Sequence, residues 1–316
     1  MRPSAFEKPG RFFKGNLHTH SNRSDGALPP DEVCKRYREA GYDFLALTDH
    51  FVGRYDYPIV DTRDFQTEAF TTLPGAELHS GAMENGELWH ILAVGLPYDF
   101  MQPNAEDFLP VPGQETGPEI AQRARDAGAF VAIAHPDWSG LTEVDARSLE
   151  AAHAVEVYNH TCSLNADRAF GFHTLERLLT EGRRLSLCAT DDAHFHVDDA
   201  FGGWVMVKAA DKRPADLLQS LKDGDFYSSQ GPHLHDIQID DGHVLVHSSK
   251  VNTVIVQGQG TATNKVHGEG LSEARVKLTK CLPSPWLRVT VIDADGKRAW
   301  SQPIWRADHP EMNWQN

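Results

Sequence analysis

The sequence of 316 residues predicts an α/β fold, with a β/α barrel over residues 1–224 and a small antiparallel β module over residues 225–316. In the first part, short and almost continuously apolar runs alternate with amphipathic stretches, which is typical of parallel strands covered by helices. Seven or eight such units follow one another before residue 224, which favours a barrel over an open sheet. After residue 225, apolar and polar residues alternate and no helical pattern is present.

The apolar runs are the predicted barrel strands, and the predicted helices lie between them. Pro29 and Pro30 precede Asp31 at one predicted helix start, where the fixed φ of proline suits the first turn. Several of the helical stretches end in glycine, which favours helix termination. We expect the strands at residues 16–20, 44–49, 73–79, 88–96, 129–135, 154–159, 184–191 and 203–208. We expect the helices at residues 29–41, 119–128, 141–150, 165–182 and 213–224.

The predicted C-terminal module consists of alternating runs joined by tight turns. Asp241-Gly242 and Asp295-Gly296 stand between such runs, and both pairs accept the positive φ angles of a short hairpin. The sequence of the module shows only a hydrophobic pattern and turns, so a binding or dimerisation role stays open.

The charge of the chain limits the partners that it can have. Thirty basic and 45 acidic residues give a net charge of −15. Such an acidic surface argues against a protein whose main task is to grip a nucleic-acid backbone. It does not argue against an enzyme that acts on a phosphate, because metal ions in the site invert the local sign of charge.

Cysteine usage and the N-terminal stretch predict a soluble, cytoplasmic protein. The four cysteines form no C-x-x-C pair, which is typical of reduced thiols. No leader-like apolar segment stands at the start of the sequence, and no later run approaches the length of a membrane span. We therefore expect neither a membrane partner nor a disulfide framework.

Polar residues of metal-binding types gather where the predicted strands end. His18 and His20 lie two residues apart, so both rings point to the same side of an extended segment. The carboxyl ends of parallel barrel strands meet at one rim, where active sites are built. His90 departs from this rule, since it stands early in its predicted strand. The other polar residues at strand ends are Asp49, His50, Glu77, His135, Asp192 and His194.

Imidazole nitrogens and carboxylate oxygens suit zinc, manganese or iron, and this many ligands predict two or three divalent ions. Each motif alone has an ordinary explanation: Asp49 could cap a strand, and His194 and His196 form a competing H-x-H pair. The order of the motifs at successive strand ends favours a metal centre. Spacing favours Asp192 over Asp191 as a ligand, because Asp192 and His194 share one side of an extended segment.

The stretch HTHSNRSDGALPPDEVCKRYREAGYDFLALTDH resembles the N-terminal signature of the polymerase-and-histidinol-phosphatase (PHP) superfamily. GAEL, HILAVGL, IAHP and DDAH resemble its later motifs in the same order, over about residues 15–208. The resemblance implies a distorted (β/α)7 barrel with a trinuclear metal centre. One ion would be held by His18, His20, Glu77 and Asp192, a second by Glu77, His90 and His135, and a third by Asp25, His50 and His194.

The C-terminal part, with FGGWVMVKA and RVTVIDADGKRAWSQPIW, resembles PHP hydrolases of the carbaryl-hydrolase-like branch. We expect a metal-dependent hydrolase, foremost a phosphoesterase (a phosphatase or phosphodiesterase) that cleaves a small phosphate ester through a hydroxide bridging two ions. The alternative is a carbamate, ester or amide hydrolase with the same metals, and a non-catalytic metal-binding protein is a third class. The expected catalytic residues are His194, Asp192 and Glu77, and the expected substrate contacts are Arg23, His160 and Trp138.

Overall fold

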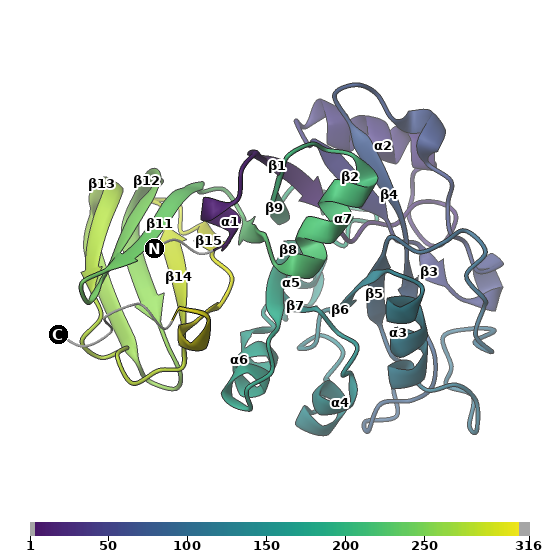
Figure 1. Ribbon diagram of the computed structural model, residues 1–316. Coiled ribbons are helices and arrows are strands. Elements are labelled where there is room, and N and C mark those ends of the chain that lie inside the picture. Colours follow the sequence, from purple (N-terminus) through teal and green to yellow (C-terminus); the bar gives the residue numbers. More distant parts are fainter. Residues whose placement is uncertain (1–3, 310–316) are drawn as a thin grey trace.

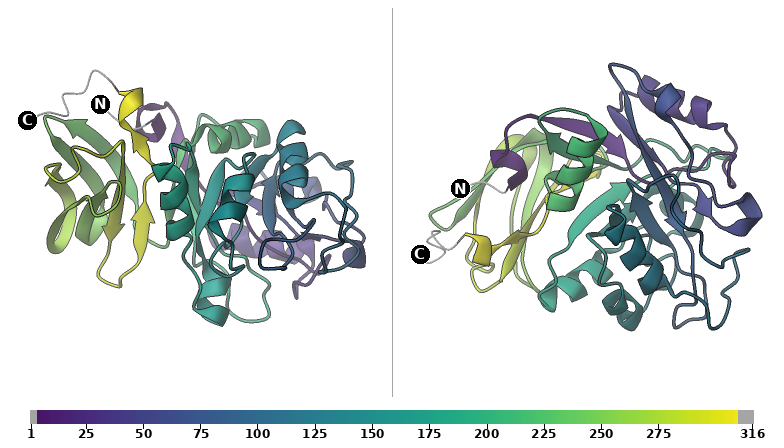
Figure 2. Two further views of the ribbon diagram at one scale, coloured as in Figure 1. Left: turned by 90° about the horizontal axis from the view of Figure 1, so that it is seen from below. Right: turned by 45° about the vertical axis from the view of Figure 1, so that its right-hand side comes forward.

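A curved, mixed β-sheet with helices around it forms the larger part of the molecule, and a β module packs at its side (Figure 1). The structure is a computed structural model that describes residues 4–309. Both described ends of the chain lie on the side of the β module (Figures 1 and 2).

The curved part of the sheet has the strand order β9-β1-β2-β4-β5-β6-β7-β8, with the short β3 paired to β4. Its interior is filled by apolar side chains that include Leu17, Phe44 and Phe130. Leu217 and Leu221 of the last helix belong to the same cluster, so this helix closes one end of the curved sheet. The strands are β1 (Arg11–Asn16), β2 (Phe44–Leu47), β3 (His50–Phe51), β4 (Thr71–Leu78), β5 (Ile91–Val94), β6 (Phe130–Ile133), β7 (Ala154–Asn159), β8 (Ser186–Thr190) and β9 (Trp204–Ala209).

Two strands run against the parallel direction that the sequence pattern predicted. β5 is antiparallel to both β4 and β6, and β9 is antiparallel to β1. The connection from β4 to β5 contains no helix and turns back through an Ala82–Leu88 bridge. A parallel crossover usually carries a helix across the face of the sheet, and this connection of 12 residues without a helix returns β5 as an antiparallel neighbour.

No ladder joins β8 to β9 within residues 4–309, so the predicted barrel is not closed by a continuous sheet. Beyond the strands, an isolated parallel bridge joins Thr19 to Ala193, and its backbone hydrogen bonds run from Asp192 N to His18 O and from His20 N to Ala193 O (both 2.9 Å). Side chains instead bind the polar groups of the β8 edge. Gln302 accepts a hydrogen bond from Leu187 N (2.7 Å) and donates one to Leu187 O (3.0 Å). Ser228 accepts from Ala189 N (3.1 Å), so this edge of the sheet is satisfied without a partner strand.

Helices occur at or close to the places that the sequence pattern predicted. Thr116 and Glu119 form a capping box at the start of α3, and Thr142 and Asp145 form one at the start of α4. No helix within residues 4–309 has the length and apolar character needed to cross a bilayer. The helices are α1 (Ser4–Glu7), α2 (Pro30–Glu39), α3 (Gly117–Asp126), α4 (Glu143–Ser148), α5 (His160–Ala166), α6 (Phe172–Thr180) and α7 (Pro214–Asp223), and short 3-10 turns lie at Gly53–Tyr55, Arg63–Phe65 and Arg306–Asp308.

The C-terminal strands are antiparallel, as the alternating pattern predicted. Asp241 (φ 44°) and Gly242 (φ 67°) form the tight turn expected between two of them. The predicted boundary at residue 224 stays a prediction, since β10 pairs with both β9 and β15 and joins the two parts in one sheet. The strands are β10 (Phe226–Ser229), β11 (Leu234–Asp240), β12 (His243–Gln257), β13 (Thr263–Lys277), β14 (Trp286–Ile292), β15 (Arg298–Trp300) and β16 (Ile304–Trp305).

Candidate metal centre

Glu77, the second-last residue of β4, lies at the centre of a buried group of histidines. Its Oε1 lies 2.7 Å from His90 Nδ1 and 3.1 Å from His135 Nε2. Its Oε2 lies 2.7 Å from His50 Nδ1 and 3.6 Å from His18 Nε2. One carboxylate therefore contacts side chains from four different segments of the chain.

His90 reaches this centre because β5 runs in the reverse direction. In an antiparallel strand, the residue before the first strand position lies at the rim where parallel strands end. His90 directly precedes β5, and β5 pairs with Glu77 and Leu78 of β4. The early position of His90 in its apolar run is thus explained by strand direction.

The structure brings all nine predicted metal ligands into one cluster. They form overlapping groups in which the possible ligand atoms lie within 4.8 Å of one another. The groups are His20, Asp25, His50 and His194; His50, Glu77, His79 and His90; His18, Glu77 and His135; and His18, His20 and Asp192.

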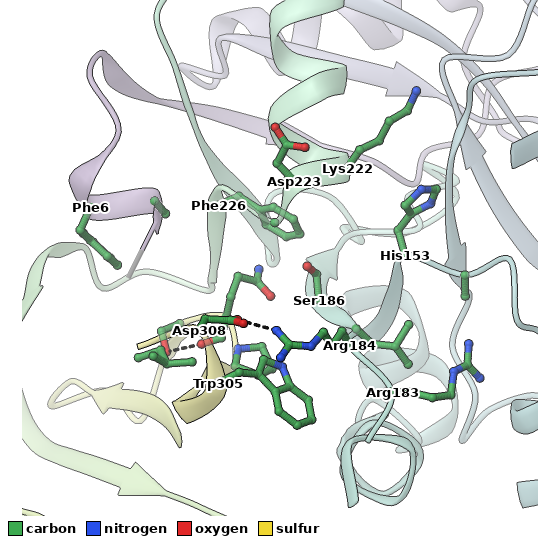
Figure 3. A pocket seen from close by; sticks show the side chains of 18 of the residues that line it. Phe6, His153, Arg183, Arg184, Ser186, Lys222, Asp223, Phe226, Trp305 and Asp308 are labelled. Carbon is green, nitrogen blue, oxygen red and sulfur yellow. Dashed lines mark hydrogen bonds and ion pairs between the residues drawn. The ribbon is translucent and has the colours of Figure 1, made fainter. Parts of the chain in front are cut away.

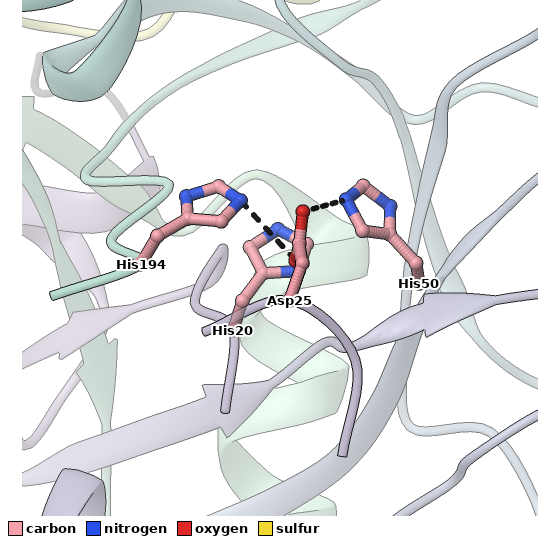
Figure 4. Close-up of side chains that lie close together, drawn as sticks. All are labelled: His20, Asp25, His50 and His194. Atoms are coloured by element: carbon pink, nitrogen blue, oxygen red, sulfur yellow. Dashed lines mark ion pairs between the residues drawn. The ribbon is translucent and has the colours of Figure 1, made fainter. Parts of the chain in front are cut away.

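Asp25 and three histidines form the most exposed of these groups (Figure 4). Asp25 Oδ2 lies 3.4 Å from His50 Nε2, and Asp25 Oδ1 lies 3.5 Å from His194 Nε2. His20 Nδ1 lies 3.7 Å from Asp25 Oδ1. Four side chains thus converge from the loop after β1, from β3 and from the segment after β8.

The chemistry of the cluster fits divalent cations. His18 Nε2 and Glu77 Oε2 are buried and make no hydrogen bond within the described residues, although Glu77 Oε2 has His50 Nδ1 close by. A buried polar atom left unpaired costs about 1–3 kcal/mol. Cations bound between these atoms would remove this cost, and the mixed imidazole and carboxylate donors suit zinc, manganese or iron.

Electrostatics keep the carboxylates of the cluster ionised. Burial favours the neutral acid, but His50, His90 and His18 hold the pKa of Glu77 well below its usual range. Burial and the neighbouring rings of His194 and His50 lower the pKa of His20 to about 3. Ionised carboxylates and a neutral imidazole are the protonation states that metal binding requires. Despite burial, Glu77 and Asp25 raise the pKa of His50 to about 10, so an ion held by His50 would displace a proton.

Glu156 and Asn159 of β7 position the ligands from behind. Glu156 Oε1 lies 3.0 Å from His18 Nδ1, which leaves His18 Nε2 directed at the cluster. The other oxygen accepts hydrogen bonds from His135 N (2.6 Å) and Asn159 Nδ2 (3.0 Å). Asn159 Nδ2 also donates to Asp192 Oδ2 at 3.0 Å, so one network holds three of the predicted ligands.

The two adjacent aspartates after β8 have different environments. Asp191 accepts hydrogen bonds from the backbone N–H groups of Gly202 (2.8 Å) and Gly203 (2.9 Å) and from the Tyr37 hydroxyl (2.7 Å). Asp192 has a φ of 58°, a left-handed conformation that is uncommon outside glycine, and it faces His18 and His20. Asp191 is thus held by the fold, and Asp192 lies in the metal-ligand cluster.

Other predicted residues lie in different surroundings. Asp49 accepts hydrogen bonds from Ser21 N (2.7 Å) and Ser24 Oγ (2.7 Å), so it organises the loop between His20 and Asp25. His196 binds the Asp25 carbonyl oxygen (2.7 Å) and is in none of the ligand groups. The competing H-x-H pair of the sequence therefore supplies one member of the cluster, His194.

A cavity of about 780 Å³ opens over the cluster. Trp138, an expected substrate contact, lines it and packs against the His135 and His90 rings at centroid distances of 4.9 and 5.4 Å. Arg23 and His160 are not among its lining residues, and His160 Nδ1 lies 2.9 Å from the Tyr158 hydroxyl. Arg168 lines the cavity and is its cationic side chain besides the histidines.

Two residues near the cluster, His79 and Glu156, were not predicted from the sequence, although their positions in the strands indicate a role. His79 stands two residues after Glu77, so strand alternation places both on one side, and its Nε2 lies 2.8 Å from His50 Nδ1. Glu156 stands inside an apolar strand, where a buried carboxylate needs a partner.

Comparison with known proteins gives a family for part of the chain. Residues 16–96 match the model of the PHP domain family. The 5'-3' exoribonuclease Rnm of Escherichia coli K12 is 35% identical over 94 residues, which are 30% of this chain and 31% of that protein. Rnm of Salmonella typhimurium LT2 matches to the same extent. The chain thus spans about a third of the length of these relatives.

A solved structure shares the fold over nearly the whole chain. It is a two-domain protein from Bacteroides vulgatus, described as containing a predicted PHP-like metal-dependent phosphoesterase. The sequences are 16% identical, the match covers 96% of this chain and 99% of that one, and the TM-score is 0.53. Residues 16–96 thus match the PHP domain family, and the fold of nearly the whole chain is shared with this two-domain protein.

Proposed function

We propose that this protein is a metal-dependent phosphoesterase that hydrolyses a small phosphate ester. The observation that supports it most is the cluster of ten possible ligands, His79 included, at the floor of an open cavity. The volume of about 780 Å³ suits a small molecule or the end of a chain. The net charge of −15 disfavours a long contact with a nucleic-acid backbone.

The proposed metal ligands are the nine residues of the sequence prediction, with two or three divalent ions shared among them. Glu77 belongs to two of the ligand groups and His20 to two, so neighbouring ions would share side chains. When bound, such ions lower the pKa of water toward neutrality and polarise a phosphoryl oxygen.

The side chains of the chain itself have three proposed tasks. Glu77 and Asp192 hold negative charge at the floor of the site, which keeps cations in place against the phosphate group. Trp138 and Arg168 on the cavity wall bind and orient the substrate. His194 exposes 19% of its side chain, and its Nδ1 lies 2.7 Å from the Asp192 carbonyl oxygen, which leaves Nε2 directed at Asp25. With three ions bound, Nε2 would be a metal ligand; with two ions bound elsewhere, the protonated ring would pass a proton from Nε2 to the leaving group.

The sequence prediction of Arg23 and His160 as substrate contacts stays a weaker proposal, because neither lines the cavity. The resemblance to carbaryl hydrolases gives carbamates, esters and amides as the alternative substrate class, because the same centre could attack their carbonyl carbon. Arg168 on the cavity wall favours an anionic substrate and therefore the phosphate ester.

The test is hydrolysis of p-nitrophenyl phosphate, p-nitrophenyl acetate and a 5'-phosphorylated RNA oligonucleotide by one preparation of known metal content. Chelator-sensitive phosphate release, lost in Asp192→Asn and kept in the control His235→Ala on the exposed side of β11, would support the proposal. Cleavage of the acetate alone would replace it with the carbonyl alternative. Cleavage of the oligonucleotide alone would make RNA ends the substrate.

A further inference from the structure

A second cavity of about 600 Å³ lies between the curved sheet and the β module, away from the metal-ligand cluster (Figure 3). His153 directly precedes β7 and Ser186 begins β8, and both line this cavity. The candidate ligands Asp192 and His194 follow the opposite end of β8, and the two cavities share no lining residue. We call the second one the lower cavity.

Basic side chains gather on one side of the lower cavity, although the chain is strongly acidic. Arg125, Arg183 and Lys222 line it next to His153, and Figure 3 shows His153, Arg183 and Lys222 on the same side. Burial, followed by the positive charges of Arg125 and Lys222, lowers the pKa of His153 to about 4. The charges of Arg125 and Lys222 both act on His153, and that of Arg125 also acts on Arg183, so these basic side chains lie near one another.

No carboxylate of residues 4–309 forms an ion pair with Arg125, Arg183 or Lys222, although Glu150 and Glu181 act on the charge of Arg183 and Asp223 on that of Lys222. Arg183 donates to the carbonyl oxygens of Ala146 (2.9 Å) and Leu149 (2.8 Å), and Arg125 donates to that of Ala151 (3.1 Å). These contacts fix the guanidinium groups beyond the end of α4 but leave their charge in place. Lys222 makes no hydrogen bond or ion pair with any residue from 4 to 309.

The acidic residues of the lower cavity are mostly engaged elsewhere. Asp308 pairs with Arg184 (2.5 Å), on the other side of the cavity in Figure 3. Asp223 pairs with Lys8 (3.6 Å). Glu150, the remaining acid on the basic side, is exposed to solvent. The basic side chains on this side therefore keep donors that no carboxylate of residues 4–309 binds directly, although Glu150 and Asp223 lie near Arg183 and Lys222.

An apolar surface adjoins the basic side. Phe226 is fully buried, and Leu185 and Trp305 lie nearby in the lining. The Arg184 guanidinium lies 5.0 Å from the centre of the Trp305 ring, which holds that ring in place. A cavity with a few convergent polar groups and an apolar wall is the usual form of a small-molecule site.

We propose that the lower cavity binds a small phosphorylated molecule with an apolar or aromatic moiety, its phosphate held by Lys222, Arg125 and Arg183. A phosphate group supplies the negative charge and the acceptor oxygens that these donors lack. The apolar part of the ligand lies against Trp305, which is partly exposed. The site does not depend on the metal centre.

Titration calorimetry on chelator-treated protein tests the proposal, with adenosine 5'-monophosphate and inorganic phosphate as probes. We expect the nucleotide to bind and phosphate to bind more weakly. Lys222→Ala should weaken nucleotide binding roughly tenfold or more, because it removes one charge-assisted hydrogen bond. Lys222→Arg should restore most of the affinity, and Lys250→Ala, an exposed lysine at the end of the His243–Lys250 segment of β12, should change nothing.

Asp192→Asn separates the lower cavity from the metal centre, since this variant changes only the latter. Unchanged nucleotide binding in Asp192→Asn supports the proposal. Binding that is lost in Asp192→Asn, or that is equal in Lys222→Ala and the wild-type chain, overturns it, and so does absence of binding to the wild-type chain. None of these outcomes bears on hydrolysis by the metal-loaded protein, so the two proposals fail separately.

Discussion

At the scale of single residues, the buried acids divide into those that face the cluster and those that hold the backbone. Asp192 contacts two histidines, whereas Asp191 accepts hydrogen bonds from three successive backbone N–H groups at residues 201–203. Burial raises the pKa of Asp191 to about 6, although the Tyr37 hydroxyl and these backbone donors act in the opposite direction. Of these two adjacent aspartates, Asp191 thus stabilises the fold, and Asp192 belongs to the candidate site.

We expect Asp192→Asn to lower kcat by roughly a thousandfold or more, because it removes charge needed at the reacting centre. The melting temperature of the chelator-treated protein should change little. Asp191→Asn should instead destabilise the fold by about 1–3 kcal/mol, since part of its hydrogen bonding is lost in a buried place. Calorimetry and steady-state kinetics on both variants check this pair. Full activity of Asp192→Asn at normal metal content would contradict the site assignment.

Glu156→Gln tests the positioning network behind the ligands. Glutamine retains the size of the side chain but removes the charge that orients His18, so we expect the affinity for metal to fall about 10–100-fold. The affinity for metal is measured as the metal content of the protein after dialysis against buffers of increasing chelator concentration. Glu68→Gln, at an exposed position, is the control, and equal metal retention in both variants would show that Glu156 has no such role.

At the scale of the elements, strand direction and edge chemistry shape the site. The reversed β5 brings His90 to Glu77. Gln302 and Ser228 bind the polar backbone groups of the β8 edge, where a ladder to β9 would otherwise close the barrel. Beyond this edge, backbone hydrogen bonds from Asp192 N to His18 O and from His20 N to Ala193 O join the residues after β8 to those after β1. Asp192 and His194 follow directly after β8.

Gln302→Ala should therefore leave the Leu187 N–H and carbonyl without their partner. We expect a loss of stability of about 1–3 kcal/mol, together with faster amide exchange at Leu187. Hydrogen-exchange mass spectrometry on the segment that contains β8 measures the second effect. Gln219→Ala on α7, which removes an exposed hydrogen bond to Asp223, is the control. Unchanged exchange at β8 would mean that Gln302 does not protect this edge.

At the scale of the whole molecule, the cluster joins segments that lie far apart in the chain. Its members run from His18 to His194 and come from most of the segments that build the curved sheet. A ligand that binds the folded state and not the unfolded state stabilises the former according to its concentration and affinity. Bound metal should consequently stabilise the entire curved sheet.

Removal of metal should lower the melting temperature of the wild-type protein, by an amount equivalent to about 4 kcal/mol at a thousandfold excess over Kd. His20→Ala, which removes a residue common to two ligand groups, should show a much smaller chelator effect. Differential scanning calorimetry with and without chelator checks both. A chelator effect of equal size in His20→Ala would indicate that the stabilising ion binds elsewhere.

The sequence by itself determined the α/β class, most of the strands and helices, the antiparallel C-terminal strands and a set of residues able to bind metal. These features follow from local patterns: apolar periodicity, turn residues such as Asp241-Gly242, and the side of the strand to which His18 and His20 point. Because the polar residues end successive strands, even their convergence could be expected before the fold was known.

Only the tertiary structure decided the direction of β5, the open edge at β8, the division of tasks between Asp191 and Asp192, and the lower cavity. Each depends on contacts between residues far apart in the chain, which no local pattern records. Glu156 shows the reason most clearly. Within its strand it is one carboxylate among apolar residues, and its role as a positioning residue depends on its contact with His18, 138 positions earlier.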